Sequence, residues 1–184
     1  MGQLKMIRFG GDLKEEFLPH GYKFEFFKGS EQEINDWLNI CSNGLTPNKN
    51  PKWFDKCIAT YPHLVPQNDL FFVVDECGKP VATTSAVTRQ SGEGYIHMVA
   101  VLFFCRGKGI GRAMLWFAVT ELQKRGCSKI VLTTDDFRLS AIKTYLDAQF
   151  RPVIYNDGQT DMRSRWDNVL LRLNYRAVDY MFED

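Results

Sequence analysis

The sequence has little of three features that would mark a specialised class of protein: paired cysteines, long apolar runs and an excess of one charge. Its five cysteines are widely spaced without a C-x-x-C pair, which argues against a disulfide framework and a zinc site and favours the reducing cytoplasm. No stretch approaches the ~20 apolar residues that cross a bilayer, and the first residues show no signal-peptide run. The formal net charge of +1 predicts no nucleic-acid or membrane partner. We therefore expect a cytoplasmic protein without a metal.

The chain has 184 residues, of which 45% are hydrophobic and 24% charged, as in an ordinary folded protein. This length is enough to bury a core without disulfides or metals. We find no internal repeat, low-complexity stretch or linker, and therefore predict a single domain over residues 1–184. The first 22 residues are poorly periodic and are predicted to form an N-terminal extension.

Periodicity and turn residues predict strands and helices over most of the chain. The predicted strands cover residues 23–27, 70–74, 81–88, 95–102, 129–134, 150–155 and 168–173. A capping box, Ser30 to Glu33, opens a first helix through Cys41, and Pro51 begins a second. A long helix runs from 110 to 122, and a shorter one, capped by Asp135 and Asp136, contains Ile142 and Tyr145. Residues 158–165 are predicted to be a polar loop. The order β-α-α-β-β-β-α-β-α-β-β indicates a mixed α/β fold.

The segment from Arg106 to Arg112 carries the most chemical information, because it joins a buried strand to a long helix. A helix start leaves backbone N–H groups unpaired and is partly positive, so it suits a phosphate. The alternating glycines allow positive φ and close approach, and three basic residues add charge. The segment therefore predicts a pyrophosphate site. It lacks the Gly-Lys-Ser/Thr of a P-loop, and its spacing and position do not fit a dinucleotide fingerprint.

These residues resemble the acetyl-CoA signature of the GCN5-related N-acetyltransferase (GNAT) superfamily, R/Q-x-x-G-x-G/A, which corresponds here to Arg106–Gly111. Val99–Val101 resembles the strand that precedes the signature. Residues 134–145 resemble the later segment with its Ala-Ile-x-x-Tyr helix, and Phe150 opens the next strand. The resemblance implies an α/β (α+β) acyltransferase fold with a mixed, mostly antiparallel sheet of about six or seven strands and about four helices. Its coenzyme-binding core would span residues 95–155.

The sequence also departs from the family pattern. Gln149 replaces the usual Gly before Phe150, Leu139 stands where Pro is frequent, and Cys105 stands where an aromatic is common. Arg138 stands where many members have Asn, which leaves the usual pantetheine contact from that position open. None of these departures touches the pyrophosphate loop.

The resemblance implies an N-acetyltransferase with acetyl-CoA as its co-substrate. In this family the pantetheine arm lies beside the strand before the loop, and a bulge splays that strand from its neighbour. An amine attacks the thioester directly, and a strand N–H stabilises the developing oxyanion. The cofactor-binding residues carried over from the family are Val99, Ala100, Val101, Arg106, Gly107, Lys108, Gly109, Ile110, Gly111, Arg112 and Arg138.

Two residues are candidates for the proton transfers. Tyr145 matches the tyrosine that many members use as general acid for the leaving thiolate, and an ordinary Tyr pKa of about 10 keeps it protonated. Packing of a half-buried tyrosine on the sheet is the alternative. His97 is the candidate base, since the period of two places it on the strand face of Val99 and Val101 and serotonin N-acetyltransferases are similar at this position. A core histidine is the alternative, and Glu93 is the rival base.

The acceptor implied by the resemblance is a primary amine of a small molecule or a peptide. Residues 34–61 and 157–167, which would shape its site, hold several aromatic rings that core packing explains equally well. Transfer of a longer acyl group and a catalytically silent acetyl-CoA sensor remain alternatives. The oligomeric state, monomer or homodimer, is left open.

Overall fold

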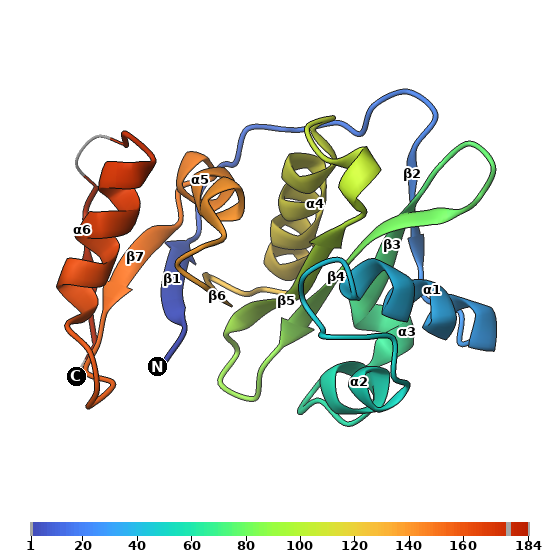
Figure 1. Ribbon diagram of the computed structural model, residues 1–184, viewed down its shortest axis with the longest axis horizontal. Helices are drawn as coiled ribbons and strands as arrows, with labels where there is room; N and C mark the ends of the chain where they lie inside the picture. The colour runs from blue at the N-terminus through green and yellow to red at the C-terminus, as the bar shows by residue number, and fades with distance from the viewer. Residues whose placement is uncertain (1, 176–177, 184) are drawn as a thin grey trace.

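An eight-stranded sheet runs through the computed structural model, which describes residues 2–175 and 178–183 (Figure 1). The strand order is β2-β3-β4-β5-β6-β1-β7-β8, and all neighbours are antiparallel except the pairs β5–β6 and β7–β8. The strands are β1 (Leu4–Phe9), β2 (Lys23–Phe26), β3 (Leu70–Val74), β4 (Pro80–Thr88), β5 (Gly94–Val101), β6 (Lys129–Thr134), β7 (Arg151–Ile154) and β8 (Met181–Phe182). The mixed, mostly antiparallel sheet is confirmed, with eight strands rather than six or seven.

Six α-helices surround the sheet, two more than expected, and within the described ranges none is long and apolar enough to cross a membrane. They are α1 (Glu31–Cys41), α2 (Lys52–Phe54), α3 (Pro66–Asp69), α4 (Ile110–Lys124), α5 (Leu139–Asp147) and α6 (Met162–Arg172). A π-helix, η1 (Asp55–Ala59), continues α2, and a 3₁₀ turn, η2 (Phe103–Cys105), follows β5. The capping box is confirmed, because Ser30 Oγ accepts the Glu33 N–H and the Glu33 carboxylate accepts the Ser30 N–H.

The core is divided by the sheet into two apolar clusters. Neighbouring residues of a strand point to opposite faces, so Phe72 of β3 packs in one cluster with Trp37 of α1, and Phe71 packs in the other. The second cluster also contains Ala118 of α4 and Trp166 of α6. Helix α1 therefore covers one face, while α4 and α6 cover the other.

The N-terminal segment is not an extension as expected, because Leu4–Phe9 forms β1 inside the sheet. This strand pairs antiparallel with β6 on one side and β7 on the other. Leu4 and Met6 are completely buried. The pattern was missed because Arg8, a charged residue, is also buried; its guanidinium donates to the carbonyl oxygens of Phe9, Gly11, Asp12 and Ala148. Only residues 10–22 form a connection outside the sheet.

The predicted strand at 168–173 is also wrong, because residues 168–172 belong to α6 and Leu173 is its C-cap. Asp161 caps this helix through a carboxylate that accepts the Ser164 N–H at 3.1 Å, so the predicted polar loop ends there. Met162, Trp166 and Val169 recur at helical spacing and are buried. The predicted cap at Asp135 and Asp136 is wrong too, since α5 starts later, after Arg138.

Candidate active site

Strands β5 and β6 begin as a parallel pair and then separate. They pair only from Gly94 to Ile96 on β5 and from Ile130 to Leu132 on β6, although both strands continue. On its other side β5 stays paired with β4 up to Val101, after a register shift. Within the described residues, the β6 side of β5 from residue 97 to 101 therefore has no strand partner. The segment Val99–Val101, expected to bind pantetheine, lies in this unpaired part.

A bulge at Met98 bends β5 where the separation begins. Met98 adopts a left-handed φ of 57°, and the register shifts between Thr83 and Ser85 of β4. The extra residue interrupts the alternation of side chains along the strand. His97 lies opposite Ser85 and Ala100 lies opposite Thr83, so these two share a face.

This geometry corrects the expected face of His97. The period of two predicted that His97 shares a face with Val99 and Val101, but Val101 lies opposite Ala82 and therefore on the other face. His97 instead points toward η1. The family resemblance predicted a bulge in this strand, but the sequence does not mark its position, since Met98 is not a residue type that favours positive φ.

The glycine loop ends at the start of α4 in a form that suits a phosphate. Gly107 and Gly109 have φ of 77° and 85°, and Gly109 begins the helix without a side-chain cap. A Cβ built at Gly107 or Gly111 would meet no atom within 4 Å, so the approach to the loop is open. The unpaired N–H groups at this helix start and the open backbone fit the pyrophosphate of a coenzyme A molecule. Ile110 and Gly111 are the first residues of α4.

The four basic residues of the predicted coenzyme set divide into two pairs. Lys108 and Arg112 lie beside the loop with exposed side chains; Arg112 is 3.9 Å from Glu16, and Lys108 Nζ is 3.4 Å from the Tyr22 hydroxyl. The guanidinium groups of the other pair are already bonded to protein. Arg106 donates to the carbonyl oxygens of Val101 and Asn43, and Arg138 donates to the Asp135 carboxylate and the Gly44 carbonyl oxygen.

Tyr145 lies on α5 within the cluster that contains α4 and α6. Its side chain is buried, and its hydroxyl bonds to no group among the described residues. Burial raises the pKa of Tyr145 to about 12. The phenol therefore stays protonated at neutral pH and has a proton to donate.

The side chain of His97, on β5, packs against η1 and the residues that follow it. Its Nε2 lies 3.0 Å from the Cys57 carbonyl oxygen, and its ring stacks on Tyr61 at 4.0 Å. Because a carbonyl oxygen only accepts, the hydrogen bond assigns the proton to Nε2 and leaves Nδ1 as an acceptor. Burial lowers the pKa of His97 to about 4, so the imidazole is neutral at pH 7. The rival base, Glu93, is occupied by ion pairs with Arg89 and Lys129.

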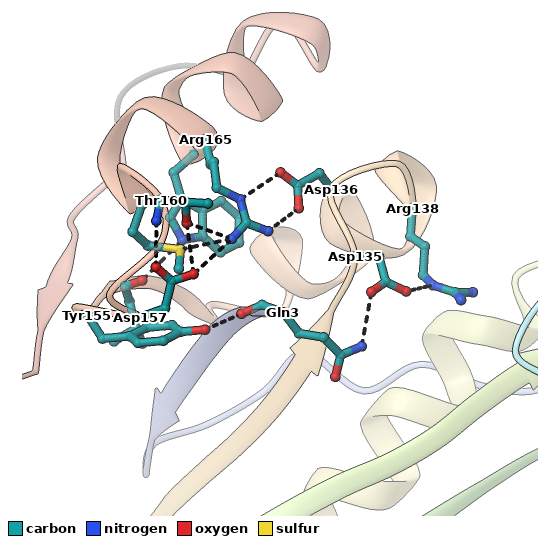
Figure 2. Close-up of polar contacts among 11 residues, drawn as sticks. Gln3, Asp135, Asp136, Arg138, Tyr155, Asp157, Thr160 and Arg165 are labelled. Atoms are coloured by element: carbon teal, nitrogen blue, oxygen red, sulfur yellow. Dashed lines mark hydrogen bonds and ion pairs between the residues drawn. The ribbon is translucent and has the colours of Figure 1, made fainter. Parts of the chain in front are cut away.

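Three residues beside the strand separation were not singled out from the sequence. The Tyr95 hydroxyl and Thr133 Oγ1 lie 2.9 Å apart and bridge β5 and β6. Gln3, which precedes β1, donates to Asp135 (Figure 2). It also accepts a hydrogen bond from the Thr133 hydroxyl. Gln3 could not have been found without the position of β1. Tyr95 carried a signal, since it lies two residues before His97 on the same strand face.

A polar cluster fixes α6 to the β6–α5 connection (Figure 2). Arg165 of α6 binds both oxygens of Asp136, at 2.5 and 3.0 Å, and this contact lowers the pKa of that carboxyl. Backbone N–H groups of Gln159 and Thr160 hold the pKa of Asp157 at about 2. In the described part of the chain, no three His, Cys, Asp or Glu side chains gather to hold a metal ion.

Comparison with known proteins agrees with this architecture of a split sheet and a glycine-rich helix start. Residues 32–150, more than half of the chain, match the model of the Acetyltransferase (GNAT) family. The chain is 36% identical over 72 residues to GCN5-related N-acetyltransferase 4, chloroplastic, of Arabidopsis thaliana. The fold and the match define an acyltransferase. More specifically, the chain belongs to the GNAT family.

Solved structures show the same fold at low sequence identity. A GCN5-related N-acetyltransferase from Sphaerobacter thermophilus superposes with a TM-score of 0.66 at 19% identity, over 81% of this chain and 47% of that one. The NatC complex bound to Gag peptide and CoA gives a TM-score of 0.56 at 18% identity, over 68% and 81% of the two chains. The Arabidopsis alignment covers 39% of this chain and 25% of its relative, so this chain corresponds to only part of these two GCN5-related proteins.

Proposed function

We propose that this protein transfers the acetyl group of acetyl-CoA to a primary amine of a small molecule or peptide. The observation that supports the proposal is the separation of β5 from β6. The chain that leaves β5 then leads to the start of α4, where the N-cap is a glycine that makes no side-chain hydrogen bond. A strand edge offers backbone groups to an extended pantetheine arm, and the helix start offers N–H groups to the pyrophosphate. Family membership supports the reaction class.

The coenzyme would lie along β5 and the loop that follows. The backbone of Val99, Ala100 and Val101 would pair with the pantetheine amides. The N–H groups from Gly107 to Gly111 would bind the pyrophosphate, while that of Arg112 already donates to the Gly109 carbonyl oxygen. Lys108 and Arg112 supply the nearby positive charge, because their side chains are exposed beside the loop. The CoA in the NatC neighbour supports this assignment by analogy of fold.

Two side chains would carry out the two proton transfers of the reaction. The amine nitrogen attacks the thioester carbon, the C–S bond breaks, and Tyr145 gives its hydroxyl proton to the departing sulfur. The proton of the attacking amine passes to Nδ1 of His97, directly or through water. With a pKa of about 4, His97 is a weak base that is fully available at neutral pH. The limb of the pH–rate profile is therefore expected near pH 4 rather than 6.5.

The decisive experiment measures thiol release from acetyl-CoA over a panel of amines and amino-terminal peptides, with CoA binding followed by calorimetry. We expect CoA to bind and at least one amine to stimulate thiol release. A protein that binds CoA but acetylates no amine would be an acetyl-CoA sensor, and failure to bind CoA would contradict the coenzyme site itself.

We further propose that the protein acts in the cytoplasm. All five cysteines are free, and Cys41, Cys105 and Cys127 are buried, which is compatible with a reducing compartment. The assembly, a monomer or a homodimer, can be measured by light scattering of the purified protein.

A further inference from the structure

The loop that follows α1 accepts hydrogen bonds from two arginines, which lie on opposite sides of the separation between β5 and β6. This loop, residues 42–46, is named here the α1 loop. Arg106 lies after β5, and its Nη2 donates to the Asn43 carbonyl oxygen at 2.7 Å. Arg138 lies after β6, and its Nη2 donates to the Gly44 carbonyl oxygen at 2.8 Å. Because the two acceptors are consecutive carbonyls, the α1 loop spans the gap between the segments that leave the two strands.

The contacts on each arginine are more than one hydrogen bond. Arg106 Nε also donates to the carbonyl oxygen of Val101, the last residue of β5, at 3.0 Å. Arg138 Nε pairs with Asp135 at 2.8 Å, just after β6 (Figure 2). Two fixed donors on a planar guanidinium set its orientation, which lysine cannot reproduce. Each arginine therefore ties the α1 loop to the end of one of the two strands that separate.

The conformation of the α1 loop allows these contacts. The carbonyl oxygens of Asn43 and Gly44 lie beyond the end of α1 and accept from the two arginines rather than from helix N–H groups. Gly44 adopts a φ of 121°, which a residue with a Cβ rarely does. The N–H groups of Leu45 and Thr46 both donate to the Cys41 carbonyl oxygen, which anchors the loop to α1. In Figure 1 the connection that leaves α1 passes over β5.

These contacts also decide what Arg106 does. Arg106 opens the glycine loop and was expected to bind the coenzyme, but its side chain turns away from that loop toward Val101 and Asn43. Turning back would leave two carbonyl oxygens without these donors. The ring of Phe103, 5.7 Å from the guanidinium carbon, packs on the same group, as Phe137 does on Arg138 at 5.0 Å.

We propose that Arg106 and Arg138 are positioning residues that hold the α1 loop across the strand separation and couple its closure to coenzyme binding. The inference rests on the proposed function, since the coenzyme would lie along β5 and the glycine loop. A coenzyme in that position fixes the backbone on both sides of Arg106, and Arg106 fixes Asn43. The closed loop keeps water away from the thioester and forms a wall for the acceptor amine.

Hydrogen–deuterium exchange of the full-length protein tests the coupling with CoA as the probe. In the wild type, CoA is expected to slow exchange of the amides of the α1 loop, residues 42–46. In Arg106→Gln and Arg138→Gln, exchange of these amides without CoA should rise about tenfold or more, as expected for loss of a charge-assisted hydrogen bond. CoA should no longer protect them, and Arg106→Lys should restore little.

Arg112→Gln is the matched control, because it removes the same charge beside the same loop without touching the α1 loop. It should weaken CoA binding and leave exchange of the free α1 loop as in the wild type. With any amine that proves to be a substrate, Arg106→Gln and Arg138→Gln should raise the KM for that amine more than they lower kcat.

Two results would overturn the proposal: α1-loop exchange that does not change in the two Gln variants, or wild-type exchange that CoA leaves unaltered although it binds. Neither measurement requires turnover. Failure to acetylate any amine would therefore contradict the proposed function without deciding the role of the arginines. Global unfolding of a variant is recognised separately, because exchange would then rise over the whole sheet.

Discussion

At the scale of single residues, the clearest chemical consequence comes from the burial of Tyr145. Burial raises its pKa to about 12, so the phenol is protonated at every pH at which the enzyme is expected to work. Tyr145→Phe keeps the ring in the core and removes only the proton donor. If thiolate protonation limits the rate, kcat should fall by about 10²–10⁴-fold, as is typical of general acid catalysis. Steady-state kinetics, with CoA affinity and melting temperature as controls, measure this effect. An unchanged kcat would mean that another acid protonates the thiolate or that this protonation does not limit the rate.

His97 predicts a pH dependence of stability, independent of its role in catalysis. Its pKa is depressed from 6.5 to about 4 in the folded protein, so below pH 6.5 the unfolded chain binds a proton that the folded chain does not. The neutral histidine therefore contributes its full stability above pH 6.5 and loses it as the pH falls toward 4. The loss approaches about 3 kcal/mol, because each pKa unit corresponds to about 1.4 kcal/mol.

The variant His97→Gln isolates this contribution, since Gln does not titrate. The difference in unfolding free energy between wild type and variant should narrow from pH 7.5 to pH 4.5, as measured by urea denaturation. As the proposed base, His97 should also lose kcat/KM on this substitution. A variant with reduced stability but wild-type kinetics at all pH values would make His97 a residue of the core only.

At the scale of elements, the start of α4 gives a test of the coenzyme site. Gly109 has a φ of 85°, so any side chain there is strained. Gly109→Glu and Gly109→Gln add the same bulk and strain and differ in charge. We expect both to weaken CoA binding, and Glu to weaken it at least about tenfold more than Gln, because phosphate must approach that point. Equal CoA affinities of the two folded variants, measured by calorimetry, would show that the phosphate does not bind near Gly109.

The same elements explain which parts of the structure could be predicted from the sequence. The Ser30–Glu33 box and the glycine loop are local signals, because their chemistry is complete within a few residues, and α1 and α4 form as predicted. Helix α6 was misread because Val169, Leu170 and Leu171 are consecutive apolar residues that also suit a strand. The features that indicate a helix are the four-residue spacing of Met162 and Trp166 and the capping residue Asp161 that precedes them.

For the site, the sequence predicted the coenzyme loop but not how the surrounding side chains are used. Arg106 opens the glycine motif and Arg138 lies in the later segment that resembles the family, so both were predicted to bind the coenzyme. Their bonding to Asn43 and Gly44 depends instead on a loop about 60 to 95 residues away in the chain. The bulge at Met98, which sets the orientation of His97, depends on pairing with β4. Such long-range contacts leave no periodic trace in a sequence.

At the scale of the whole molecule, the position of β1 determines whether the sheet is continuous. The first strand of the chain fills the gap between β6 and β7, and it pairs with β6 over all six residues from Leu4 to Phe9. Among the described residues, β1 is the strand that connects β7 and β8 to β6 in the sheet. Residues outside the matched family segment of 32–150 are thus part of the core.

A chain that begins at Asp12 tests this dependence directly. It lacks the buried side chains of Leu4, Met6 and Ile7 and exposes unpaired backbone along β6 and β7, which buried strands do not tolerate. We expect it to lose cooperative thermal unfolding and to bind a hydrophobic dye. The milder Leu4→Ala should remain folded and lose about 2–5 kcal/mol, as is usual for a buried leucine, whereas Leu171→Ala, with a side chain 80% exposed, should change little. A truncated chain that melts cooperatively at the full-length temperature would show that β6 and β7 close without β1, and that the N-terminal strand is dispensable to the sheet that holds the active site.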